Sequence, residues 1–232
     1  MLRNERGNIL LTLTALTTDI TAVGALGTAA FGLVDALKAL PGGGISRAGF
    51  KFVRSQIAAL TPPDPALEGG GLSQASVLFT LMSQWINGTD SDDQLNIAKS
   101  QIKLRLTETT AATLATATGV NAQTLGDVAA SIASGTALTP QQTDAYGRFD
   151  LMLTTLLDQA YQRADQRYRN VAKLAAIPVA VVLAVVAAHV TGLVGPGEAI
   201  LLGLIATPIA PIAKDISTAI NSSAQAIQTI KG

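Results

Sequence analysis

The sequence contains no cysteine and a single histidine, His189. Disulfides, thiolate nucleophiles and zinc–thiolate sites are therefore excluded, and so is any metal site built from several histidines. Charged residues are also scarce, at 14% of the chain, against about a quarter in typical soluble proteins. The formal net charge is zero, so the composition does not favour a nucleic acid as a partner.

The motifs of common enzyme and cofactor sites are missing as well. The glycine clusters at 42–44 and 69–71 are not followed by the lysine and the serine or threonine of a phosphate-binding loop. The acidic run at 90–93 lacks the spacing of a calcium-binding EF-hand, and no G-x-S-x-G or H-E-x-x-H motif occurs. We therefore expect a protein that is not an enzyme and that holds no cofactor or metal.

Apolar and small residues are abundant, and their first long run covers residues 9–40. As a helix this run would be about 48 Å long, more than the roughly 30 Å of a bilayer core. Gly24, Gly27 and Gly32 give it a smooth surface against which a second helix can pack closely. We read residues 1–44 as an N-terminal transmembrane segment of the mature chain. The alternatives are a cleavable signal peptide and an alanine- and glycine-rich helix of a soluble core.

Residues 45–138 show the pattern of shorter amphipathic helices. Between 46 and 60, apolar and basic side chains lie largely on opposite helix faces, which suits either an anionic membrane surface or docking against a soluble domain. A linker rich in proline and glycine completes the segment 45–71. Apolar clusters at helical spacing then predict a small helical domain over residues 72–138.

One long helix is expected to cover residues 139–194. It starts with a threonine–proline pair, and no proline or glycine interrupts residues 148–177. Residues 174–190 carry no charged side chain, and the apolar stretch up to residue 194 is about 31 Å long as a helix, which matches a bilayer core. A second membrane span is therefore predicted at the end of this helix.

A return leg at 195–213 completes a helical hairpin. Pro208 and Pro211 lie within it, so we expect this leg to be short and broken. Broken helices of this kind also line the paths of transporters.

Basic residues are distributed unequally around the hairpin. Arg163, Arg167, Arg169 and Lys173 precede it, together with Tyr168, whereas the turn at its tip carries only an acid. By the positive-inside rule, both ends of the hairpin, the middle domain and the C-terminus lie in the cytoplasm. The same side chains either bind anionic lipid headgroups or only enforce the orientation, and the two roles are compatible.

The last segment, residues 214–232, combines an isoleucine stripe with an almost uncharged polar face. The stripe consists of Ile216, Ile220, Ile227 and Ile230. Such a face suits a partner helix better than a lipid surface.

Two stretches carry a resemblance to a group of known proteins. They are R-x4-Y-R, formed by Arg163, Tyr168 and Arg169 before an apolar span, and GLIATPIAPIAKD at 203–215. The chain resembles uncharacterised bacterial membrane proteins that have a basic, aromatic juxtamembrane motif, a C-terminal transmembrane hairpin and a hydrophobic N-terminal segment. The resemblance covers the last quarter of the chain and implies this topology, with no activity attached.

These features predict an all-α integral membrane protein with about three hydrophobic spans and a small helical cytoplasmic domain. We expect a scaffold or accessory subunit of the bacterial inner (plasma) membrane, in contact with membrane lipids and assembled through helix–helix contacts with its own copies or a partner membrane protein. The alternative is a transport or pore-forming subunit. A third reading is a soluble helical protein that hides its hairpin until a trigger inserts it.

Overall fold

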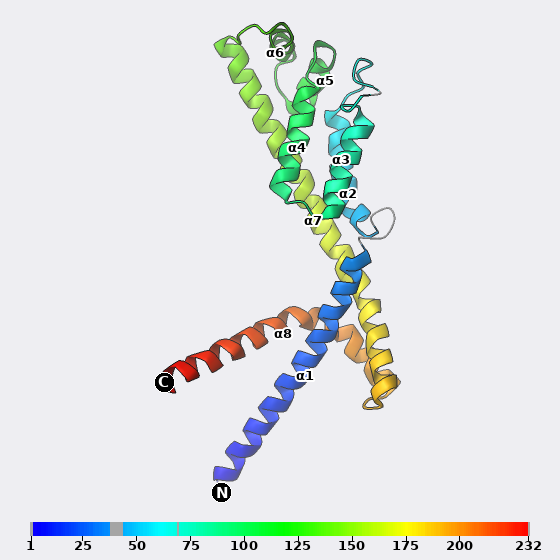
Figure 1. The fold of residues 1–232 in the computed structure, drawn as a ribbon, viewed down its shortest axis with the longest axis vertical. Helices are drawn as coiled ribbons and strands as arrows, with labels where there is room; N and C mark the ends of the chain where they lie inside the picture. Colours follow the sequence, from blue (N-terminus) through cyan, green and yellow to red (C-terminus); the bar gives the residue numbers. More distant parts are fainter. Residues whose placement is uncertain (1, 38–43, 69, 232) are drawn as a thin grey trace. The chain divides into compact units, whose positions relative to one another are not determined.

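The computed structural model is built of α-helices, and the part of the chain that it describes contains no strand (Figure 1). The structure describes the backbone of residues 2–37, 44–68 and 70–231, and the side chains of 18–37, 44–68, 70–213, 215 and 218. The helices are α1 (Leu2–Ala36), α2 (Ser46–Leu60), α3 (Gln74–Asn87), α4 (Ser91–Leu104), α5 (Glu108–Thr118), α6 (Ala122–Ser134), α7 (Pro140–Thr191) and α8 (Pro196–Lys231). The prediction of an all-α fold is confirmed.

The chain divides into two compact units. The hairpin unit consists of Met1–Leu40 and Asn170–Gly232, and the bundle unit consists of Pro41–Arg169. The long helix α7 contributes its residues up to 169 to the bundle unit and the remainder to the hairpin unit. The two units differ in the size of the side chains that they bury, and each is described separately below.

Large apolar side chains form the core of the bundle unit. Helices α2 to α6 and the first part of α7 all contribute to it, and its largest members are Ile57, Leu60, Leu81, Ile102, Leu114, Leu125, Phe149, Leu153 and Leu157. The apolar face of α2 is therefore buried against the other helices of the bundle unit. The sequence left two alternatives for this helix, a membrane surface or docking against a domain, and the structure shows docking. The basic residues of α2 remain exposed.

The helices of the bundle unit begin and end at residues suited to these positions. The side chain of Asp90 caps α4 by accepting a hydrogen bond from the amide of Asp92 at 2.9 Å, and Thr107 forms a capping box on α5. Gly88 ends α3 in the left-handed conformation, with φ of 70°, which glycine adopts without strain. The predicted start of the long helix at Pro140 is confirmed.

A buried arginine anchors the proline- and glycine-rich segment after α2 through hydrogen bonds to its backbone. Arg105 is fully buried, and its guanidinium donates to the carbonyl oxygens of Pro62 and Leu72. Asp64, also buried, accepts a hydrogen bond from the hydroxyl of Thr107 at 2.9 Å. These bonds fix the path of the segment from α2 to α3, because breaking them would leave a buried guanidinium without acceptors for its terminal nitrogens. The Nε atom of Arg105 has no partner among the described residues.

Three helices of the described chain have stretches long and apolar enough to cross a membrane. They are Thr18–Ala36 of α1, the apolar part of α7, and Pro196–Ala213 of α8. At 1.5 Å per residue the first and the last are about 27–28 Å long, close to the thickness of a bilayer core.

The expectation of a short, broken return leg is wrong. Helix α8 continues from Pro196 to Lys231 with Pro208 and Pro211 inside it, and Figure 1 shows that it bends along its course. A proline removes one backbone hydrogen bond and kinks a helix, but its φ angle is helical, so a helix packed against neighbours can continue through it.

Candidate functional site

The buried residues of the hairpin unit are small. On α7 they are alanines at every fourth position, namely Ala176, Ala180, Ala184 and Ala188. On α1 and α8 they are mostly glycine, alanine and threonine, namely Gly24, Gly27, Ala30, Val34, Ala199, Gly203, Ala206, Thr207, Ala210 and Ala213. Small residues at such spacing let helix backbones approach closely, which is how helices pack in a lipid environment.

Two of the predicted packing glycines lie between α1 and α8. A Cβ added at Gly24 would overlap the Cβ of Ala213, and one added at Gly27 would overlap the carbonyl oxygen of Ala206. Any larger residue at either position would force the helices apart. Gly32 is different: it is exposed, and among the described residues no atom lies within 4 Å of a Cβ built there. Within the described part of the chain, Gly32 therefore takes no part in helix packing.

A third close approach, at Gly203, was missed by the sequence reasoning. A Cβ at Gly203 would collide with the backbone of Val181 in α7, so this glycine sets the distance between the two legs of the hairpin. The signal was present in the sequence, because Ala199, Gly203 and Thr207 repeat a small residue at every fourth position.

Large apolar side chains lie on the outside of the hairpin unit. Leu193 is 82% exposed and Val190 is 78% exposed. Other exposed members are Leu33, Leu174, Val182, Val186, Ile200, Leu201, Leu204, Ile205 and Ile212. In water the opposite arrangement is favoured, with the largest apolar side chains inside. The bundle unit has that arrangement, because its core consists of large apolar side chains. The surface of the hairpin unit is therefore suited to an apolar solvent.

A groove of about 480 Å³ runs between α1 and α8. Thr21, Gly24, Ala25, Thr28 and Ala29 line it from α1, and Ala210 and Ala213 line it from α8. The hydroxyl of Thr28 donates to the carbonyl oxygen of Gly24 at 2.9 Å. Because this bond is internal to α1, the groove wall offers methyl groups and backbone rather than an unsatisfied polar group.

One buried polar group of the hairpin unit has no partner in the described chain. It is the hydroxyl of Thr207, whose side chain is only 6% exposed. Pro211, four residues later, has no amide hydrogen, so the carbonyl oxygen of Thr207 also lacks its usual helical donor. Thr207 thus combines an unpartnered hydroxyl with a carbonyl oxygen that has lost its usual helical donor, within an otherwise apolar stretch.

The basic residues predicted to precede the second span are all exposed on α7: Arg163, Arg167, Arg169 and Lys173. Arg169 donates to the carboxylate of Asp165, one turn earlier, at 2.7 Å. Tyr168, the fifth predicted residue, is partly buried, and its ring meets that of Trp85 edge-on at 6.5 Å between centroids. Tyr168 is therefore fixed in place, whereas the arginines and the lysine extend outward.

Trp85 joins three helices of the bundle unit. Its indole nitrogen donates to the carbonyl oxygen of Ser46 at 3.0 Å, and its ring lies 6.4 Å from that of Tyr161. Gly49 permits this junction, since a Cβ there would collide with the carbonyl oxygen of Ala164. The sequence gives no sign that Trp85 ties the start of α2 and the end of α3 to α7, because these contacts join segments far apart in the chain.

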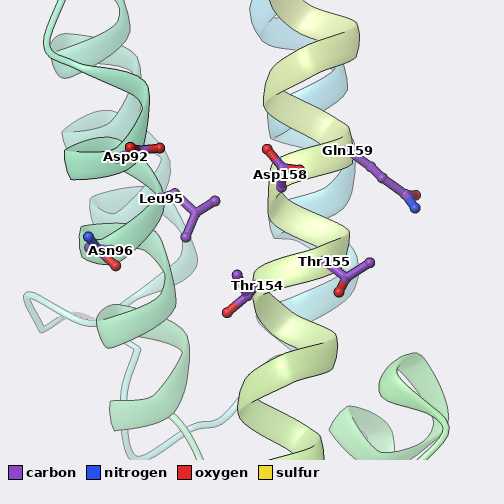
Figure 2. Close-up of a pocket in the computed structure, with 7 residues that line it drawn as sticks. All are labelled: Asp92, Leu95, Asn96, Thr154, Thr155, Asp158 and Gln159. Carbon is purple, nitrogen blue, oxygen red and sulfur yellow. The ribbon is translucent and has the colours of Figure 1, made fainter.

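A polar hollow of about 490 Å³ lies between α4 and α7. Figure 2 shows the carboxylates of Asp92 and Asp158 pointing toward one another across it, with Leu95 and Thr154 beside them. Two carboxylates provide hydrogen-bond acceptors but too few ligands for a protein-built metal centre. Among the described residues no group of three or more metal-ligating side chains occurs.

An ion pair connects α4 to α7 beside this hollow. Lys103 donates to Asp150 at 2.8 Å, and Lys99 lies 3.4 Å from the same carboxylate. The hydrogen bond from Lys103 holds the pKa of Asp150 below its usual value. Lys103 also lies over the ring of Tyr146, 4.8 Å from its centroid. These contacts fasten two helices and leave no free base or nucleophile in this cluster.

The predicted partner-helix stripe lies outside the described side chains. Ile216, Ile220, Ile227 and Ile230 belong to the last part of α8, where only the backbone is described. Their proposed contact with a partner helix stays a prediction.

Comparisons with protein-family models, with curated proteins and with solved structures find no match to this chain. The resemblance to bacterial membrane proteins noted from two stretches of the sequence therefore stays a prediction, and the function has to be argued from the residues themselves.

Proposed function

We propose that the protein is a non-enzymatic, membrane-anchored scaffold or accessory subunit that assembles through helix–helix contacts. The observation that carries this proposal is the packing of the hairpin unit, with alanine and glycine inside and leucine, isoleucine and valine outside. In lipid, exposing these large apolar side chains carries no free-energy penalty, because acyl chains are as apolar as leucine. The small residues inside allow the helix backbones to approach closely.

In this proposal the apolar parts of α1, α7 and α8 cross the bacterial inner membrane, and the bundle unit lies in the cytoplasm. The support for the orientation is the excess of basic residues before the apolar part of α7, compared with the acidic turn between α7 and α8. The bundle unit then presents its helices at the cytoplasmic face.

Assembly would use a side of α1 that is exposed in the described part of the chain. Thr21, Ala25, Thr28, Ala29 and Gly32 are all exposed and share one helix face, and most of them line the groove against α8. We propose that the same face of a second copy packs there. Its small residues allow close backbone contact, which is what drives association between helices in a bilayer.

Cysteine cross-linking tests this assembly directly, because the natural chain has no cysteine. Ala25→Cys and Ala29→Cys, each in native membranes under mild oxidation, are expected to give a covalent dimer. Leu201→Cys, on an exposed position of α8, is the matched control and is expected to stay monomeric. A lone monomer for all three variants, with no other chain co-purifying in mild detergent, would overturn the scaffold proposal.

Thr207 favours a second candidate, a transport or pore-forming subunit. Its unpartnered hydroxyl, and its carbonyl oxygen without the usual helical donor next to Pro208 and Pro211, resemble the irregular backbone that binds ions within membranes. Asp19 is an acid within the apolar stretch Thr18–Ala36 of α1. This candidate predicts ion or solute flux in proteoliposomes that changes on Thr207→Val, Pro208→Ala or Asp19→Asn. Equal flux in all variants and in protein-free vesicles would exclude it.

A further inference from the structure

We propose that α8 is hinged at residues 207–211 and that this hinge controls whether the groove between α1 and α8 can take a second copy of the chain. The inference rests on the proposed assembly through the exposed face of α1, and it adds a means of regulating that same groove. All the residues concerned belong to the hairpin unit.

The first step of the argument is that this turn of α8 lacks part of the helix backbone bonding. Pro208 and Pro211 have no amide hydrogen, so the carbonyl oxygens of Leu204 and Thr207, four residues earlier, lose their usual donors. Figure 1 shows that α8 bends along its course, and sharp kinks in helices are found at proline. Resistance of α8 to bending is therefore lowest at this turn.

The second step is that the hydroxyl of Thr207 does not brace the turn. The hydroxyls of Thr28, Thr118 and Thr191 each donate to the carbonyl oxygen four residues earlier in their own helices. The hydroxyl of Thr207 has no partner among the described residues, although the side chain is only 6% exposed.

The bent form of α8 therefore carries the free-energy cost of a buried, unpartnered hydroxyl. A form in which the turn straightens lets this hydroxyl donate to the carbonyl oxygen of Gly203, as the other threonines do in their helices. The straight form loses packing against α1 but also loses this cost. Two opposing terms of this kind bring two conformations close in free energy, which is the condition for a switch.

The third step is that α8 is held differently on the two sides of the turn. Before it, an added Cβ at Gly203 would collide with the backbone of Val181, and backbone cannot shift without moving the whole helix. After it, an added Cβ at Gly24 of α1 would first meet the Cβ of Ala213, which is a single methyl group opposite a residue without a side chain. The part of α8 after the turn is therefore the part that is free to move.

The fourth step connects this movement to the groove of about 480 Å³. Ala210 and Ala213 form its wall on α8, and five residues of α1 form the other wall. Both alanines follow the turn, so a change in the bend moves their wall. The bent form leaves the groove lined on both sides, ready for the α1 helix of a second copy. The straight form takes one wall away.

The test measures distances within one chain by double electron–electron resonance. Full-length protein in vesicles carries spin labels at Leu33→Cys of α1 and Ile212→Cys of α8, which are 50% and 55% exposed, and is diluted with unlabelled protein. The natural chain has no cysteine, so the labels are specific. We expect two distances with the natural turn and one in Pro208→Ala/Pro211→Ala, which restores both backbone donors.

Thr207→Val changes the balance in the opposite direction. It keeps the shape of the side chain and removes the unpartnered hydroxyl, so we expect the ratio of bent to straight form to rise by about fivefold or more. The covalent dimer formed by Ala25→Cys should increase with Thr207→Val and decrease with Pro208→Ala/Pro211→Ala. The matched control, Leu33→Cys with Leu201→Cys, an exposed position before the turn, should give one distance in every variant.

The outcomes separate the hinge from the assembly. A single distance for Leu33→Cys/Ile212→Cys that neither variant changes would overturn the hinge, whether or not the dimer forms. Two distances with a dimer yield that is the same in all variants would overturn its control of the groove. Two distances without any dimer would overturn the proposed assembly, and with it the regulation, but not the movement of α8. Should the double proline variant fail to fold, equal populations in Thr207→Val and the natural chain would overturn the hinge.

Discussion

Gly203 of α8 lies directly against the Cα atom of Val181 in α7, so that a single added Cβ would collide with the backbone of the facing helix. The residues that follow in each helix, Leu204 and Val182, are exposed. The hairpin thus places its smallest residue inside and its large apolar residues outside. Small buried residues and large exposed apolar residues recur along α1, α7 and α8, and this pattern is the basis for the proposal that the hairpin unit lies in an apolar solvent.

Replacing Gly203 by valine should separate the two legs of the hairpin. Overpacking of a tight contact costs about 1–3 kcal/mol, and the colliding atoms here are backbone, which cannot rotate away. We expect Gly203→Val to lower the thermal midpoint of the detergent-solubilised protein and to increase its aggregated fraction on size exclusion. Gly147→Ala, in an open helical position of α7, is the control and should be neutral or slightly stabilising. A wild-type profile for Gly203→Val would contradict the close packing.

Replacing Arg105 by alanine should release the segment between α2 and α3. The change leaves the carbonyl oxygens of Pro62 and Leu72 without donors and opens a cavity, for an expected loss of about 2–4 kcal/mol in the free energy of unfolding. Unfolding followed by Trp85 fluorescence measures the loss, and limited proteolysis should cut within residues 61–73. Arg54→Ala removes an exposed arginine and should change neither.

The ion pair between α4 and α7 should make stability depend on acid pH. The hydrogen bond from Lys103 holds the pKa of Asp150 below its usual value, so the folded state binds the proton less readily than the unfolded chain. Its contribution is therefore present above the unfolded pKa of about 3.9 and is lost as pH falls through the lower folded value.

We expect Asp150→Asn to be less stable than the wild type at neutral pH, by about 1 kcal/mol or less because the carboxylate is partly exposed. The difference should shrink as the pH falls below the unfolded pKa of about 3.9 and through the lower folded pKa. Thermal midpoints measured across this range give the test, with Asp144→Asn, an exposed acid of the same helix, as control. A difference that is constant with pH would show that the ion pair is not its source.

Much of the fold follows from local patterns in the sequence. Apolar runs of bilayer length predicted the apolar stretches of α1, α7 and α8, and the threonine–proline pair at 139–140 marked the start of α7, because helix-start signals and apolar periodicity are local. The small-residue face of α1 was also visible, and the structure places Gly24 and Gly27 against α8.

Other features depend on contacts between segments far apart in the chain. Nothing near Arg105 indicates that its guanidinium bonds to carbonyls at Pro62 and Leu72, and nothing near Trp85 indicates that it holds Ser46. The continuity of α8 through Pro208 and Pro211 was missed because proline is a helix breaker in isolation, whereas packing against neighbouring helices decides its effect here.

The most direct test of the central claim, that one chain has surfaces for two solvents, compares two exposed apolar positions on the same helix. In a Trp85→Phe background, tryptophan is introduced either at Val186, in the hairpin unit, or at Leu151, in the bundle unit; these residues are 54% and 65% exposed. Fluorescence quenching by brominated acyl chains is then measured in reconstituted vesicles. We predict strong quenching for Val186→Trp and none for Leu151→Trp. Water-like emission without quenching at Val186→Trp would contradict the account.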